Sequence, residues 1–305
     1  MLERSEPPFS APLFSAALQG RTIVMSGDSI MRQLWTALVC QLWSHNLVTA
    51  AATDHTNGRG AIPVDVANAS LARIKIVPYA VRIGASGYVF FGKMNLHGTL
   101  TRSLETLASN GFRKYVTASE HARAVELGVA KPPSPPSADA QLGSQDVTFI
   151  NMGIHFPPHT HYKLLGETLT KASAARRDGR GSTPQIVYVE TPPAHFPTAT
   201  GAYEEGAQND TSSGCTNHLA VSVDALQPGK SLQANERKLV RATALSLLQT
   251  YAALAPVGSA HIGGKTVAGT HVLDCSHWCL PGALDAAVLP SLQVQLDRID
   301  TGYED

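Results

Sequence analysis

Residues 21–29 read RTIVMSGDS, an apolar run that stops at a glycine and is followed by an acid and a serine. A short apolar run that ends at such a turn is typical of a buried parallel strand. In the next segment, residues 30–43, leucines recur at steps of four, which predicts a helix with one apolar face. The sequence therefore places Ser29 between a buried strand and the start of a helix.

Similar units recur along the rest of the chain. Further apolar runs of strand length lie at residues 73–77, 88–91, 147–150, 186–189 and 271–273, and helical patterns lie between them at 117–127, 159–176 and 231–253. Strands that alternate with helices predict an α/β fold with a doubly wound, mostly parallel sheet flanked by helices. Ligands bind beyond the carboxyl ends of such strands, so Ser29, Asn151 and residues 274–277 are expected to emerge there.

Composition indicates a globular chain. Of its 305 residues, 43% are hydrophobic and 16% are charged, and 24 basic residues balance 24 acidic ones. No basic stripe is present that could neutralise a phosphate backbone, which argues against a nucleic-acid partner. Prolines at positions 7, 8 and 12 interrupt residues 1–20, so this segment reads as neither a signal peptide nor a membrane span. We expect a short extension, residues 1–18, and one catalytic domain, residues 19–305.

Residues 274–282 read DCSHWCLPG and supply a second group of reactive side chains. A carboxylate three residues before a histidine can hold one ring nitrogen while the other faces a serine. Together with Ser29, Asp274 and His277 therefore provide the residues for nucleophilic acyl transfer. We expect the oxyanion to be met by the Ser29 backbone N–H and by the amide of Asn151, which follows the strand at 147–150.

Each of these residues also has a structural interpretation. Asp28 or Ser29 could simply cap the helix, Asn151 could serve the turn, and His155 could pack on its neighbour Phe156. Cys275 and Cys279 could form a disulfide around a packed His277. A zinc site is a further alternative, although a second ligand pair is not evident; its ligands would be His271, Cys275, His277 and Cys279.

Four blocks of the sequence resemble the trichome birefringence-like proteins and their PC-esterase relatives, within the SGNH or GDSL superfamily. Residues 26–33 resemble the GDS block of that family, and residues 274–282 resemble its C-terminal DxxH block almost letter for letter. Residues 146–155 are similar to its strand followed by N-x-G-H-W-W. Its S-P-x-H-F block and the glycine-rich cysteine after it are matched by residues 191–196, Gly201, Tyr203, Gly206 and Cys215. The blocks occur in the family's order across residues 18–299.

The resemblance implies an SGNH-hydrolase-like sheet with flavodoxin-like strand order, and transfer of acetyl groups to polysaccharide hydroxyls in the Golgi lumen. By this resemblance Ser29 is the nucleophile, His277 the general base and Asp274 its partner. Residues on the oxyanion or substrate side would be Gly27, Asp28, Arg32, Asn151, Gly153 and His155. The implied enzyme binds no cofactor or metal; it uses an acetyl donor such as acetyl-CoA as substrate and a polysaccharide or oligosaccharide as acceptor.

The sequence departs from the family in three places. Residues 1–18 contain no counterpart of the family's membrane anchor and cysteine-rich domain, and the block at 151–156 inserts a residue before His155 and lacks the tryptophan pair. Family cysteines at positions 40 and 279 bond to that domain, so the resemblance implies a bridge between Cys215 and Cys275. Two other hypotheses stay open: a carbohydrate or ester deacetylase that uses the same triad, and a non-catalytic glycan-binding remnant, which the departure at the N-terminal domain suggests.

Overall fold

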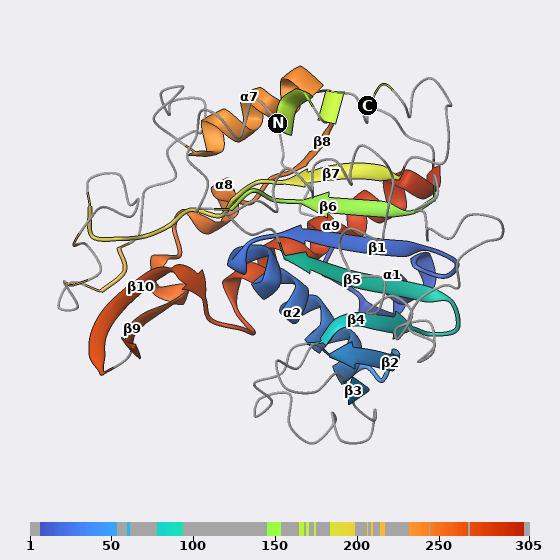
Figure 1. The fold of residues 1–305 in the computed structure, drawn as a ribbon, viewed down its shortest axis with the longest axis horizontal. Coiled ribbons are helices and arrows are strands. Elements are labelled where there is room, and N and C mark those ends of the chain that lie inside the picture. The colour runs from blue at the N-terminus through green and yellow to red at the C-terminus, as the bar shows by residue number, and fades with distance from the viewer. Residues whose placement is uncertain are drawn as a thin grey trace.

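The computed structural model describes residues 7–53, 60–61, 78–93, 145–153, 165–167, 169–170, 174, 184–198, 206, 209, 214–216, 232–243, 245–267 and 269–301. Within them, an eight-stranded sheet has the order β3-β2-β4-β5-β1-β6-β7-β8 (Figure 1). Its strands are β1 (Thr22–Gly27), β2 (Val48–Thr53), β3 (Gly60–Ala61), β4 (Pro78–Ile83), β5 (Gly87–Lys93), β6 (Val147–Ile150), β7 (Gln185–Val189) and β8 (Ser246–Leu248).

The sheet is mixed. β5, β1, β6, β7 and β8 pair with one another in parallel, whereas β2, β3 and β4 extend the β5 side with antiparallel pairs. These pairings confirm the predicted α/β fold with its mostly parallel sheet. The antiparallel extension was not predicted, because β2 and β4 lie in segments that the periodicity did not single out.

Side chains of the central strands alternate between two hydrophobic cores. Phe149 and Val187 belong to a core shared with α1 (Ala11–Ala17), α2 (Ser29–Ser44) and α9 (Ala283–Thr301). Their neighbours Ile150 and Tyr188 belong to a second core, shared with α7 (Leu232–Thr243). Every residue of β1 is buried, as expected for a strand covered on both faces. The helix predicted at 30–43 is confirmed as α2, and the strands predicted at 88–91, 147–150 and 186–189 as β5, β6 and β7.

Two predicted elements are wrong in detail. The helix expected over residues 231–253 is divided into α7, the strand β8 and the short helix α8 (Tyr251–Leu254), because residues 246–248 pair in parallel with β7 instead of continuing the helix. The strand expected at 271–273 does not join the main sheet. It lies within β10 (Thr270–Trp278), which pairs with β9 (His261–Val267) as a separate antiparallel hairpin.

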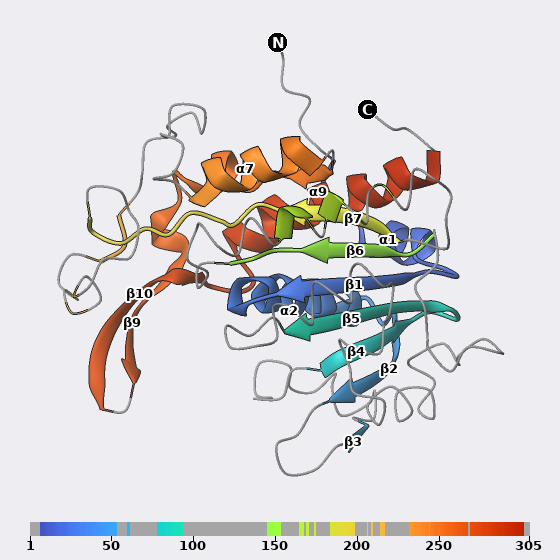
Figure 2. The same cartoon turned by 45° about the horizontal axis from the view of Figure 1, so that its top comes forward.

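The β9–β10 hairpin projects from the edge at which β1 and β6 end, as both views show (Figures 1 and 2). It follows α8 and a short 3₁₀ turn, Gly258–Ala260. The strand expected at 73–77 and the helix expected at 117–127 lie outside the described residues. Of the helix expected at 159–176, the described positions 165–167, 169–170 and 174 are helical.

The terminal helices belong to the first core. In the N-terminal segment Phe14 is fully buried, and so is Leu18, the residue after α1. Residues 11–18 therefore pack as part of the domain. Among the helices of the described residues, none is long and apolar enough to cross a membrane.

Glu236 of α7 is a fully buried carboxyl at the end of β7. It accepts hydrogen bonds from the Tyr188 hydroxyl and from the main-chain N–H and hydroxyl of Thr191. Burial raises the pKa of Glu236 to about 8, and the nearby Glu190 adds to this, against the three hydrogen bonds that lower it. The folded protein therefore holds a proton that the unfolded chain releases in mildly acidic solution.

We expect Glu236→Gln to flatten the pH dependence of stability. Between the ordinary pKa of 4.5 and the raised value of about 8, the free energy of unfolding of the wild type includes a contribution that falls as pH rises. The limiting slope for one such group is about 1.4 kcal/mol per pH unit, and glutamine, which does not ionise, removes it. Urea unfolding at several pH values measures the slope, with Glu167→Gln on an exposed helical position as control. Equal slopes for wild type and Glu236→Gln contradict the prediction.

Candidate active site

The turn between β1 and α2 presents Ser29 as the first residue of a 16-residue helix. The preceding residue, Asp28, caps the N-terminus of α2, since its Oδ1 accepts the Ile30 N–H at 2.9 Å. The Ser29 hydroxyl is thus available for another partner, in a position where the helix N-terminus favours developing negative charge. Gly27 permits the tight turn, because a Cβ atom there would lie 2.6 Å from the Met31 Cβ.

Ser29, His277 and Asp274 form one chain of hydrogen bonds. His277 Nε2 lies 2.8 Å from Ser29 Oγ, and His277 Nδ1 lies 3.0 and 3.1 Å from the two carboxylate oxygens of Asp274. Because Nδ1 faces a carboxylate it carries the ring proton, which leaves Nε2 to accept the hydroxyl proton. These distances are within the reach required of a general base and its nucleophile.

The carboxylate of Asp274 has several donors. Its Oδ1 accepts the main-chain N–H groups of Ser276 at 3.2 Å and His277 at 3.1 Å, and its Oδ2 pairs with the Lys265 ammonium. Burial by itself would raise the pKa of Asp274, but the hydrogen bonds from His277 and Lys265 outweigh it and hold that pKa well below its usual range. Asp274 therefore stays ionised and orients the imidazole at every pH near neutrality.

Lys265 was not singled out from the sequence. It lies on β9 opposite Val272, next to the adjacent glycines 263 and 264, which give that strand no clear alternation of apolar and polar residues. Pairing of β9 with β10 brings its side chain to Asp274. The local sequence around Lys265 does not predict its contact with Asp274, because that contact depends on the register of the hairpin.

Gln33 joins the nucleophile's helix to the hairpin. Its side-chain amide donates to the Trp278 carbonyl at 2.8 Å and its oxygen accepts the Trp278 N–H at 3.1 Å. Gln33 lies four residues after Ser29 on α2, so both face the same side of the helix. Trp278, beside His277 on β10, is only 1% exposed and anchors this end of the hairpin in the core. The base is thereby brought to the serine.

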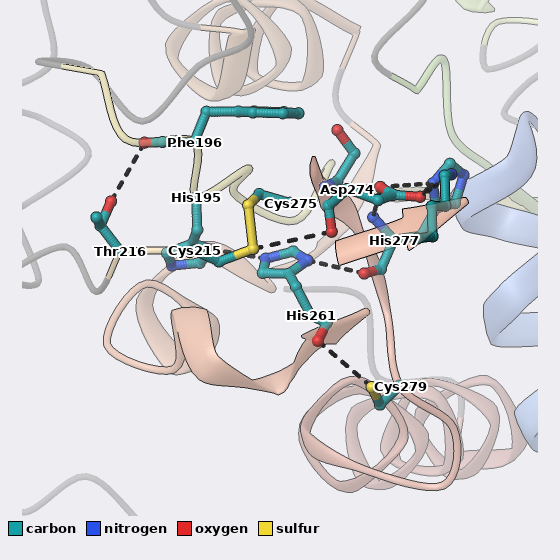
Figure 3. The surroundings of a disulfide bond; sticks show 11 residues. His195, Phe196, Cys215, Thr216, His261, Asp274, Cys275, His277 and Cys279 are labelled. Carbon is teal, nitrogen blue, oxygen red and sulfur yellow. Dashed lines mark hydrogen bonds and ion pairs between the residues drawn. A yellow bond between two sulfur atoms is a disulfide. The ribbon is translucent and has the colours of Figure 1, made fainter. Parts of the chain in front are cut away.

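A disulfide joins Cys215 to Cys275, the residue after Asp274, with a Cα–Cα distance of 5.5 Å (Figure 3). This is the bridge that the family resemblance implies. The His195 N–H also donates to the Cys275 carbonyl at 2.9 Å, so β10 is tied to residues 214–216 by the disulfide and to the loop at 191–198 by a hydrogen bond. A disulfide is compatible with a secreted or lumenal protein.

The same bridge contradicts the two structural alternatives for the cysteines. Cys275 is not bonded to Cys279, and it cannot serve as a thiolate ligand in a zinc site with His271, His277 and Cys279. Cys279 is an exposed free thiol whose sulfur lies 3.4 Å from the His261 carbonyl oxygen, and Cys40 is also free. Within the described ranges, no cluster of three or more acidic, histidine or cysteine side chains could hold a metal ion.

Asn151 does not point its amide at the serine. Its Nδ2 donates both protons, one to the Val189 carbonyl and one to the Thr191 hydroxyl, each at 2.8 Å. The orientation is fixed because the Val189 carbonyl requires a donor. This geometry therefore does not support the expected oxyanion role of Asn151, and the Ser29 N–H at the start of the helix stays a candidate donor.

Two further predicted residues, Arg32 and Gly153, lie around the same turn. Arg32 is exposed on α2, one turn beyond Ser29. Gly153 has a φ of 72° and lies against the N-cap: a Cβ atom on it would be 1.9 Å from Asp28 Oδ2. His155 lies outside the described residues. Gly153 is thus placed to support the turn that carries the nucleophile.

Comparison with known proteins assigns no family to the chain: no protein-family model matches it, and neither does any curated protein sequence. The arrangement of the site must therefore carry the functional argument.

Gly153→Ala is expected to destabilise the fold by about 2 kcal/mol, because it combines left-handed backbone strain with displacement of the Asp28 cap. Gly206→Ala is the matched control: Gly206 also has a positive φ, 86°, but no atom of the described residues lies within 4 Å of its Cβ position. The control is expected to lose only the contribution of the left-handed backbone, about 1 kcal/mol. Denaturant unfolding measures both, and equal losses in the two variants show that the contact with Asp28 is unimportant.

Proposed function

We propose that this protein is a serine-dependent O-acyltransferase that moves acetyl groups to polysaccharide hydroxyls through an acyl-serine intermediate. One observation carries the proposal: the unbroken chain of hydrogen bonds from Ser29 through His277 to Asp274. This combination of nucleophile, base and orienting carboxylate is the arrangement used for acyl transfer on unrelated folds.

In the first half of the reaction His277 Nε2 takes the Ser29 proton while Ser29 Oγ attacks the carbonyl carbon of the acetyl donor. The negative charge that develops on the carbonyl oxygen faces the N-terminus of α2 and the Ser29 N–H. Collapse of the tetrahedral intermediate breaks the bond to the leaving group, which receives the proton from His277. Asp274 remains ionised throughout and stabilises the imidazolium.

In the second half the acceptor hydroxyl approaches the acetyl-serine. His277 removes the hydroxyl proton, the acceptor oxygen attacks the acetyl carbon, and the bond to Ser29 Oγ breaks. The proton then returns from His277 to Ser29. Donor and acceptor use the same base in turn, so one histidine suffices for both steps.

The finer assignment is supported by the sequence blocks that resemble the trichome birefringence-like and PC-esterase proteins. The five parallel strands are neighbours in the order β5-β1-β6-β7-β8. If these five are numbered 1 to 5 along the chain, their order in the sheet is 2-1-3-4-5, as in flavodoxin-like sheets, which agrees with an SGNH-type domain. The Cys215–Cys275 bridge agrees with an oxidising compartment such as the Golgi lumen. The acetyl donor would be acetyl-CoA or another acetyl carrier.

Hydrolysis is the second candidate, with the same triad acting on a carbohydrate or ester acetate. The observation that favours it is solvent access, because 26% of the His277 side chain is exposed and water could reach the acyl-serine. The two activities are separated by supplying 4-nitrophenyl acetate with and without xylo-oligosaccharides. Acetylated sugar, with less free acetate, supports transfer; acetate release that is unaffected by sugar supports the hydrolase.

Ser29→Ala is expected to lower both transfer and acetate release by about four to six orders of magnitude, because it removes the nucleophile. Asp274→Asn is expected to lower them by about four orders of magnitude, because His277 loses the carboxylate that orients its ring. Ser44→Ala, at the other end of α2, is the matched control and should retain full activity. Mass spectrometry of wild type quenched during turnover is expected to find acetyl on Ser29. Equal activity of Ser29→Ala and wild type would show that Ser29 is not the nucleophile, and absence of activity in both would favour the non-catalytic glycan-binding remnant.

A further inference from the structure

A pair of buried histidines lies next to the main chain of the catalytic base, His277. His195 and His261 are 0% and 4% exposed, and His195 Nδ1 lies 2.7 Å from His261 Nε2. The other nitrogen of each ring faces a carbonyl oxygen: His195 Nε2 lies 2.7 Å from that of Ala255, and His261 Nδ1 lies 3.0 Å from that of His277. Figure 3 shows His261 between His195 and the main chain of His277.

The hydrogen bonds of this pair require one proton more than two neutral rings possess. A carbonyl oxygen only accepts, so the two outer nitrogens must both carry protons. The 2.7 Å contact between the inner nitrogens needs a third proton. Two neutral imidazoles have only two, and any placement of these leaves lone pair facing lone pair in at least one of the three contacts. The complete arrangement is therefore a singly charged pair with a shared proton.

The surroundings of the pair act on this charge in both directions. Burial lowers the pKa of His261, and so do the neighbouring His195 and His277 rings, while the His277 carbonyl and the Asp274 carboxylate raise it; the net direction is downward. The Trp278 ring lies 3.9 Å from the His261 ring, centroid to centroid, and presents a π-system that attracts a cation. With the pKa of His261 lowered to about 4, the third proton is bound in acidic solution and is lost as the pH rises through that value.

We propose that His195 and His261 are positioning residues for the base, which hold the main chain of His277 against Ala255 through a shared proton. The activity readout of this inference rests on the proposed function, whereas the proton count does not. With the third proton bound, all three contacts are hydrogen bonds and the His277 carbonyl is fixed. Once it is lost, one contact becomes repulsive and the segment that carries the base is held less firmly.

The proton count is tested by NMR of protein labelled with ¹⁵N-histidine, titrated over the pH range in which it is folded. We expect the two rings to take up one proton together, with three N–H groups below the midpoint and two above it. His261→Asn and His195→Gln assign the resonances, and the Ser29→Ala protein is expected to give the same titration. The inference is wrong if the pair carries two protons throughout.

The positioning role is tested with two substitutions at one site. Asparagine at position 261 places an amide N–H where Nδ1 donates to the His277 carbonyl but cannot reach His195, whereas phenylalanine removes both contacts. With 4-nitrophenyl acetate, His261→Phe is expected to lower kcat about 10- to 100-fold with little change in KM, because small displacements of a catalytic group cost this much. His261→Asn should recover part of this loss, and its pH profile should lack the ionisation of the pair.

His271→Asn is the matched control, since His271 lies exposed near the start of β10, the other strand of the hairpin, away from the pair. It is expected to behave as wild type. Equal kcat values for His261→Phe and His271→Asn, or identical pH profiles for wild type and His261→Asn, would overturn the positioning role. An inactive wild type would count against the proposed function, and the NMR titration would still decide on the shared proton.

Discussion

A reciprocal pair of hydrogen bonds between the Gln33 side chain and the Trp278 main chain connects the two halves of the site. Ser29 belongs to the central strand and its helix, whereas Asp274 and His277 belong to a hairpin that forms a sheet of its own. Strand pairing with the main sheet therefore does not fix the base relative to the nucleophile. The Gln33 contacts, burial of Trp278 and the Cys215–Cys275 bridge do so instead.

What could be predicted from the sequence is what depends on neighbouring residues. The buried strand, glycine turn and helix around Ser29 follow from residues 21–43 alone, and the three-residue spacing of Asp274 and His277 already allows one side chain to hold the other. The sequence left open whether Asp28 or Ser29 caps the helix. In the structure Asp28 is the cap, and the Ser29 hydroxyl lies within hydrogen-bond distance of His277. The disulfide was implied by family resemblance and not by spacing.

What could not be predicted depends on tertiary contacts. Residues 246–248 continue a helical pattern, yet they form β8 because the edge of β7 offers a parallel partner. Asn151 lies at the expected strand end, but Val189 and Thr191 take both of its amide protons. Lys265 and His261 approach the triad only through the register of the hairpin and the packing of the 191–198 loop. Such contacts have no periodicity in the sequence.

The separation of the hairpin from the main sheet divides the site between two levels of local stability. Native proteins open in cooperative units whose free energies range from near zero to that of global unfolding, and a two-stranded hairpin held by a few tertiary contacts belongs to the lower end. Amide hydrogens of β1 would then exchange with solvent only through global unfolding, while those of β10 exchange through local opening. Ser29 would then stay in place during such local opening, while Asp274 and His277 would leave it and return with the hairpin.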